Sequence, residues 1–251
     1  MQSINDFKEV VTLLRKFGIE IWADLGALLG FTREGYLLEW EEDIDCGTLA
    51  TRKDFATAEN YLEQHGWKMF DKYKGLAIQN KNCTTKIDIK FYKEEEDFVY
   101  AYFVVYKHKF VLPICDMIIW FMSGYPASYK YETVFSKDGL KVIEGISNAL
   151  PHPIPLFLSK LAEKTYFAFG LTGYKIKFPR SWVLPLCVQK VGDFPFRIPS
   201  CPEKILELTY GKNWKKPLQI VPGTDRYTDG SSRYLTVRVK EQRPELVEVA
   251  T

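Results

Sequence analysis

Residues 24–47 read DLGALLGFTREGYLLEWEEDIDCG, and the end of this stretch contains the pattern on which the fold prediction depends. Asp43 and Asp45 are separated by one residue and lie at the start of a short apolar run that is typical of a strand. Residues i and i+2 of a strand point to the same face, so both carboxylates are predicted to project together. Ile44 and Cys46 are then predicted to turn toward the core.

A third aspartate, Asp88, lies on the polar face of a second predicted strand, Lys86–Tyr92, whose other face is apolar. If the two strands are neighbours, Asp43, Asp45 and Asp88 meet at one edge of a sheet. Carboxylates this close repel one another unless a cation lies between them, and their oxygens suit Mg²⁺ or Mn²⁺. We therefore expect a metal site in which two carboxylates hold metal and the third helps to bind it or acts as a base. The alternative is that the acidic run 41–45 is a solvated loop.

The surrounding sequence predicts an α+β fold in which a mixed or antiparallel sheet is flanked by helices. Thr51 and Asp54 form a capping-box pattern at the start of a helix that is predicted to run to His65. The other elements predicted in this half are a helix through Phe7–Phe17 and β-rich runs at Ile19–Ala23, Trp67–Tyr73, Leu76–Gln79, Phe98–Tyr106 and Phe110–Ile114.

The pattern changes near residue 115, because prolines become frequent from there on. Helices are predicted at Leu156–Phe169 and Lys204–Tyr210, and the polar residues beyond Val239 are predicted to fray. We therefore expect three parts, which are a catalytic core at 1–115, a helical and loop-rich C-terminal elaboration packed on it at 116–240, and a flexible tail at 241–251.

The composition argues against some classes of protein. Lys and Arg number 34 and Asp and Glu number 32 in 251 residues, so a net charge of +2 gives no support to nucleic-acid binding. The five cysteines are dispersed and lack zinc-ligand spacing, so we expect no zinc, no disulfides and a cytoplasmic location. The longest apolar run, Phe110–Met122, is shorter than the roughly 20 residues of a spanning helix and contains Pro113 and Asp116. Peripheral membrane association stays open.

The stretch 24–47 resembles the LicD family, which includes fukutin and fukutin-related protein. The family pattern is a glycine-containing leucine segment, an arginine, a further glycine, and a tryptophan before acidic residues that end in Asp-x-Asp. The matching positions are Gly26, Leu28, Leu29, Gly30, Arg33, Gly35, Trp40, Asp43 and Asp45. Lys86–Tyr92 resembles the third-aspartate strand of the family, and Val183–Leu186 with Leu206–Trp214 resembles its C-terminal signature.

This resemblance implies a nucleotidyltransferase-like fold and a phosphotransferase. Such an enzyme moves phosphocholine or an alditol phosphate, for example from CDP-ribitol, to a glycan acceptor such as a cell-surface polysaccharide. The catalytic and metal-binding residues would be Asp43, Asp45 and Asp88, with Glu41 and Glu42 as secondary candidates. The predicted substrate-binding residues are Gly26, Gly30, Arg33, Trp40, Lys86 and Lys90.

Each substrate-binding prediction has a structural alternative. Gly30 suits close packing as well as the approach of a phosphate. Arg33 suits an ion pair with Glu34 or Glu42 as well as a donor phosphate. Trp40 suits packing of the acidic loop on the core, and the two lysines suit an ordinary solvated surface.

Three other functions remain open at this stage. A nucleotidyltransferase that moves NMP from an NTP to a protein, sugar or small molecule would use the same carboxylates. Release of pyrophosphate rather than CMP would distinguish it. A non-catalytic glycan-binding or scaffold protein, and a membrane-associated assembly factor, are the remaining alternatives.

Overall fold

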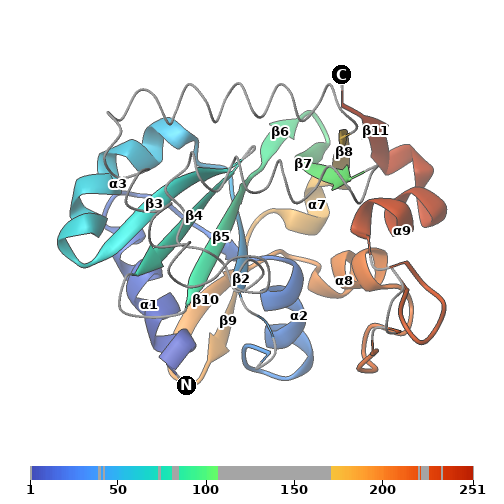
Figure 1. Cartoon of the computed structure of the whole chain (residues 1–251), viewed down its shortest axis with the longest axis horizontal. Helices are drawn as coiled ribbons and strands as arrows, with labels where there is room; N and C mark the ends of the chain where they lie inside the picture. The colour runs from blue at the N-terminus through green and yellow to red at the C-terminus, as the bar shows by residue number, and fades with distance from the viewer. Residues whose placement is uncertain are drawn as a thin grey trace, which may run out of the picture. The chain divides into compact units, whose positions relative to one another are not determined.

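The computed structural model of this chain describes residues 2–38, 41, 43–72, 75–80, 85–106, 171–219, 221, 226–232 and 234–250 (Figure 1). Two compact units are distinguished. The larger consists of Met1–Phe103 and Tyr174–Thr251, and the smaller is Val104–Gly173. Almost all described residues belong to the larger unit. Three predicted segments lie outside the described residues, namely Phe110–Ile114, Phe110–Met122 and Leu156–Phe169.

The larger unit contains a seven-stranded mixed sheet. Its strands are β1 (Trp22–Ala23), β2 (Asp43–Thr48), β3 (Trp67–Lys72), β4 (Gly75–Asn80), β5 (Lys86–Phe91), β9 (Cys187–Val191) and β10 (Phe194–Ile198). Their order is β3-β4-β5-β2-β1-β10-β9. β2 is parallel to β5 and β1 is parallel to β10, whereas the other neighbours are antiparallel. The predicted class, a mixed α+β sheet flanked by helices, is confirmed.

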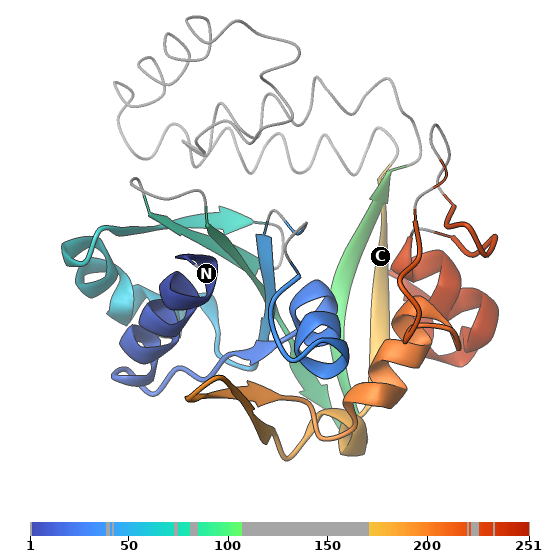
Figure 2. The same cartoon turned by 90° about the horizontal axis from the view of Figure 1, so that it is seen from below.

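Helices cover the sheet and connect its strands. They are α1 (Gln2–Arg15), α2 (Leu25–Arg33), α3 (Arg52–Gln64), α7 (Arg180–Val183), α8 (Pro202–Tyr210), α9 (Leu235–Gln242) and the 3₁₀ turn η1 (Pro244–Leu246). α1 and α3 contact each other on one side of the sheet (Figure 2). The predicted capping box is present, because the Thr51 backbone N–H donates to Asp54 Oδ2 over 2.7 Å. Among the described helices, none has the length and apolarity needed to span a membrane.

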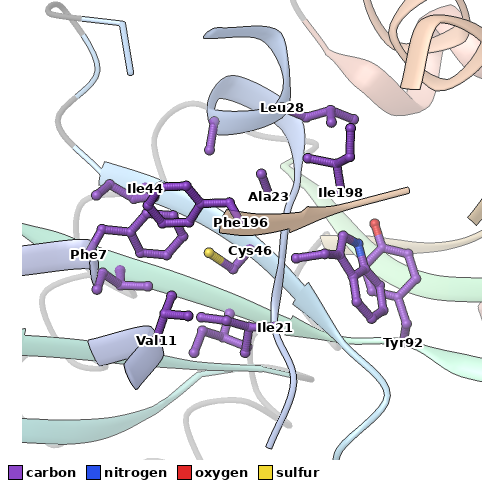
Figure 3. Packing of buried hydrophobic residues seen from close by; sticks show 14 of the residues in the cluster. Phe7, Val11, Ile21, Ala23, Leu28, Ile44, Cys46, Tyr92, Phe196 and Ile198 are labelled. Atoms are coloured by element: carbon purple, nitrogen blue, oxygen red, sulfur yellow. The ribbon is translucent and has the colours of Figure 1, made fainter. Parts of the chain in front are cut away.

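The core face of the sheet carries the apolar side chains that alternate with the aspartates. Ile44 and Cys46 of β2 are buried there, which confirms their predicted orientation. Phe7 of α1 stacks on Phe196 of β10 with ring centroids 4.9 Å apart (Figure 3). Burying one such side chain contributes about 1.5–3 kcal/mol, so this contact holds a late strand firmly against the first helix.

Strands from both sides of residue 115 therefore belong to one sheet. β9 and β10 come from the proline-rich region, and β10 itself contains Pro195. The sequence predicted no strand here, because proline cannot donate a ladder hydrogen bond and is uncommon inside sheets. The division at residue 115 stays a prediction.

A second, four-stranded sheet has the order β11-β8-β7-β6. Its strands are β6 (Lys93–Glu95), β7 (Phe98–Tyr106), β8 (Leu171–Pro179) and β11 (Val247–Val249). β11 pairs antiparallel with β8, and Leu246 just before it is buried. The sequence predicted a flexible tail at 241–251, and the structure places the end of α9 at Gln242, η1 at Pro244–Leu246 and an edge strand at Val247–Val249 within that range. A three-residue strand gives too little alternation to be recognised from sequence, and β8 supplies its hydrogen-bond partners.

The α2 helix contains two glycines in different surroundings. A Cβ on Gly30 would lie 2.6 Å from the backbone oxygen of Tyr36 and 3.1 Å from the backbone nitrogen of Leu38. A Cβ on Gly26 would lie 3.0 Å from the carboxylate of Glu41, which ends a flexible side chain. Gly30 therefore lets the segment after α2 pass close to the helix, which is the packing alternative that the sequence offered.

Gly30→Ala is expected to lower the free energy of unfolding by about 1–3 kcal/mol, because the new methyl group meets backbone that cannot move away. Gly26→Ala is the matched control. Its clash is with a mobile side chain, and alanine favours a helix by about 0.5–1 kcal/mol, so stability should stay level or rise. Urea denaturation of both variants measures the difference, and equal effects would contradict this account.

Candidate active site

The three predicted aspartates lie together on two neighbouring strands. β2 and β5 are parallel, and their register sets Asp45 opposite Asp88 and Asp43 opposite Lys86. All three aspartates are partly buried and lie on the face opposite the core residues. The structure thus brings the carboxylates to one place, as the alternation in the two segments predicted.

Two lysines on β5 balance this negative charge. Lys86 Nζ lies 3.3 Å from Asp43 Oδ2 and 3.2 Å from Asp88 Oδ2. Lys90 Nζ lies 3.0 Å from Asp45 Oδ1. Burial alone would lower the pKa of Lys86, but the charges of Asp88 and Asp43 outweigh it and raise that pKa. Both lysines therefore stay charged beside the carboxylates.

The carboxylates also repel one another. Burial raises the pKa of Asp43, and the negative charges of Asp45 and Asp88 raise it further, against the opposing effect of Lys86. Three carboxylates in one place have an excess of negative charge that two ammonium groups only partly offset. The site is therefore electrostatically suited to additional positive charge.

A fourth carboxylate, Asp24, joins this face and was not among the predicted site residues. Its backbone N–H donates to the Asp45 carbonyl over 3.0 Å, and the residue is 3% exposed. Asp24 Oδ1 accepts from the Leu25 N–H at 2.9 Å, and Oδ2 accepts from the Tyr92 hydroxyl at 2.8 Å. Burial raises the pKa of Asp24, Lys90 lowers it, and Asp45 raises it. The available signal was that aspartate is a residue type that often caps a helix N-terminus, and Asp24 is the N-cap of α2.

Two of the predicted substrate-binding residues on α2, Gly26 and Arg33, lie at opposite ends of that helix. Gly26 is in the first turn, and Arg33 lies about 10 Å further along the axis at 1.5 Å per residue. Arg33 Nε pairs with Glu34 Oε1 at 2.6 Å, and its Nη1 donates to the Trp214 carbonyl at 3.3 Å. Arg33 thus forms the ion pair that the sequence offered as its alternative role. Trp40 and Glu42 lie outside the described residues.

Tyr210, at the end of α8, is a further residue near the carboxylates that the sequence did not single out. Burial raises its pKa well above the usual range, and the charges of Asp45 and Glu41 add to the effect. The guanidinium of Arg238, on α9, lies 5.1 Å from the centre of the Tyr210 ring. The charges of residues far apart in the sequence therefore act on Tyr210, which local patterns do not indicate.

By chemical type, the residues fit a divalent metal ion. Asp43, Asp45 and Asp88 offer hard oxygen ligands of the kind that Mg²⁺ and Mn²⁺ prefer. With their present side-chain conformations, no three Asp, Glu, His or Cys residues in the described part of the chain converge on a single metal position. The carboxylates instead contact Lys86 and Lys90, so binding of a metal would require these ammonium groups to move aside.

Comparison with known proteins gives a family match and weak structural likenesses. A family model described as the LicD/FKTN/FKRP nucleotidyltransferase domain matches residues 18–138. No curated protein matches. The antibiotic-resistance factor ANT(2'')-Ia is 13% identical, with 64% of this chain and 94% of that chain covered and a TM-score of 0.26. The Vibrio cholerae di-nucleotide cyclase DncV is 12% identical, with 93% of this chain and 73% of that chain covered and a TM-score of 0.24.

Tyr92→Phe is expected to lower the free energy of unfolding by about 1–3 kcal/mol, because the buried Asp24 carboxylate loses a hydrogen-bond donor. Tyr36→Phe is the matched control, since the Tyr36 side chain is half exposed and its change should stay within about 0.5 kcal/mol. Chemical denaturation measures both values. A loss no larger for Tyr92→Phe than for the control would show that this hydrogen bond contributes nothing to stability.

Proposed function

Residues 18–138 belong to the LicD family of nucleotidyltransferase domains, and we propose that this protein is a metal-dependent phosphotransferase acting on a glycan. Family membership supports a transferase of phosphoryl or nucleotidyl groups. The finer proposal is transfer of a phospho-alditol or phosphocholine group from a CDP-linked donor. The observation that carries the metal-dependent chemistry is the register of β2 and β5, which sets Asp45 opposite Asp88 and keeps Asp43 on the same face, whereas the CDP-linked donor and the glycan acceptor are suggested by the family alone.

Asp43, Asp45 and Asp88 are the residues that would hold Mg²⁺ or Mn²⁺. The metal would supply positive charge to the diphosphate of the donor and to the charge that develops on the leaving group. This fits the repulsion among the three carboxylates, which raises the pKa of Asp43. The partial burial of the site strengthens such electrostatic interactions relative to bulk water.

The reaction that we propose is an in-line displacement at phosphorus. An acceptor hydroxyl oxygen forms a bond to the phosphorus nearer the alditol or choline, and the bond from that phosphorus to the CMP oxygen breaks. CMP leaves with the electron pair of that bond. A carboxylate that is not fully engaged in metal binding, with Asp88 as our first candidate, accepts the hydroxyl proton.

Lys86 and the first turn of α2 are two other features that suit an anionic donor. Lys86 already contacts two carboxylates and can neutralise a phosphate oxygen when they are otherwise engaged. The Glu41 carboxylate lies beside the first turn of α2, at the position where Gly26 lacks a Cβ. The helix dipole favours negative charge at this helix end, and a donor phosphate that bound there would have to displace the Glu41 carboxylate.

Nucleotidyl transfer is the second candidate function, because the matching family model is described as a nucleotidyltransferase domain. It would use the same carboxylates with an NTP as donor. A purely glycan-binding or scaffold role gives no account of three carboxylates and two lysines gathered on one face.

A donor panel separates the two reactions. The protein is incubated with a glycan acceptor and CDP-choline, CDP-ribitol, CDP-glycerol, CTP or ATP, with Mg²⁺ or Mn²⁺ and with EDTA. We expect CMP release from a CDP-linked donor, dependent on acceptor and metal. Pyrophosphate release from an NTP instead would support nucleotidyl transfer, and full turnover after exhaustive chelation would contradict the metal requirement.

Asp43→Asn, Asp45→Asn and Asp88→Asn are each expected to reduce kcat/KM by about 100-fold or more, because the amide keeps the shape but removes the charge. Asp193→Asn is the control, since Asp193 is an exposed partner of Lys8 and should keep full activity. Thermal unfolding of all four variants checks that the fold is retained. Near-normal turnover in a folded site variant would remove that aspartate from the proposed mechanism.

A further inference from the structure

Lys90 contacts one carboxylate, Asp45, and the charge of a second, Asp24, also acts on it. Its Nζ is 3.0 Å from Asp45 Oδ1, and after burial the charges of Asp45 and then Asp24 have the largest effects on it. Lys90 is opposite Gly47 in the β2–β5 register, and a Cβ on Gly47 would lie 2.5 Å from the Trp22 indole of β1, so this ring covers the position beside Lys90. Asp24 follows β1 directly, and its backbone N–H is bonded to Asp45.

In the present arrangement Lys90 and Asp24 have different partners. Lys90 compensates Asp45, while Asp24 is held by the Tyr92 hydroxyl and the Leu25 N–H. The Lys90 side chain is 23% exposed and also lies 5.5 Å from the Phe103 ring centre, so it is largely removed from water. Separating it from every carboxylate would leave a mostly buried ammonium uncompensated, which is unfavourable.

Metal binding at Asp45 would separate the Lys90 ammonium from the carboxylate that compensates it. A divalent cation on the Asp45 carboxylate competes for the oxygen that Lys90 contacts, and the two cations repel each other. Lys90 must then move away from Asp45. Asp24 is the carboxylate whose backbone is bonded directly to Asp45, and it is the one of the four that is held by a tyrosine and a helix cap rather than by a lysine.

We propose that Asp24 is a positioning residue that receives the Lys90 ammonium when Asp45 binds a divalent cation. In this account Asp24 does not touch the metal or the substrate, and Lys90 moves from Asp45 to Asp24. The inference rests on the proposed metal-dependent function. An uncharged asparagine caps a helix about as well as aspartate, so capping alone does not require a buried acid at position 24. The proposal gives the Asp24 carboxylate a role in metal binding.

A double-mutant cycle tests this proposal through metal affinity rather than activity. Mn²⁺ binding to the full chain is measured by isothermal titration calorimetry for wild type, Asp24→Asn, Lys90→Met and the double variant. Asp24→Asn should weaken Mn²⁺ binding about tenfold when Lys90 is present, because the displaced ammonium has no carboxylate to move to. In the Lys90→Met background the same change should have an effect of about threefold or less, because no ammonium needs to move.

Lys90→Met alone supplies an independent readout if Asp24→Asn does not fold. Mn²⁺ should bind this variant about tenfold more tightly than wild type, since no ammonium competes for Asp45. Unchanged or weaker binding would overturn the proposal. Thermal unfolding of every variant, with Asp193→Asn as an exposed control, separates loss of fold from loss of affinity.

The outcomes distinguish this inference from the proposed function. Absence of Mn²⁺ binding to folded wild type would contradict the metal-dependent function itself. Normal Mn²⁺ binding by wild type and by Asp24→Asn would leave that function standing and overturn the role of Asp24. An equal loss of affinity in both Lys90 backgrounds would show that Asp24 acts independently of Lys90, which also overturns the proposal.

Discussion

The parallel pairing of β2 with β5 is the constraint on which the candidate site depends. This register sets Asp45 opposite Asp88. The buried face formed by Ile44 on β2 and Ile87 on β5 fixes the register, because a shift of one residue would turn every apolar side chain toward the polar side. The hydrophobic effect on one face of the sheet thus decides which charges meet on the other face.

The electrostatic consequence is a site whose charges are only partly balanced. Lys86 and Lys90 each contact at least one carboxylate, yet the mutual repulsion of the aspartates still raises the pKa of Asp43. Such an arrangement costs stability, since partly buried charges lose hydration and repel one another. Groups with perturbed pKa values are concentrated at binding and catalytic sites, which agrees with the transferase function of the family.

The frame that supports the site comes from distant parts of the chain. Phe196 on β10 stacks on Phe7 of α1, and Arg33 at the end of α2 donates to the carbonyl of Trp214. Tyr210 on α8 lies close enough to the carboxylates for Asp45 to influence its pKa. The C-terminal segments therefore complete the sheet and border the site, although the carboxylates themselves come from the first hundred residues.

The sequence by itself determined the features that follow from local periodicity and local hydrogen bonds. Alternation predicted the two aspartate strands and their inward faces, and the Thr51 capping box predicted the start of α3. These signals are complete within a few neighbouring residues, because side-chain direction in a strand and a cap at a helix end need no distant partner.

Only the tertiary structure decided which of these elements meet. It brought Asp24 onto the face of the three predicted aspartates, directed Arg33 toward the Trp214 carbonyl, and paired Val247–Val249 with β8 as an edge strand. Each of these outcomes depends on backbone or side-chain partners that are remote in the sequence. A local pattern specifies which face a residue belongs to, whereas long-range pairing and packing specify which residues share that face.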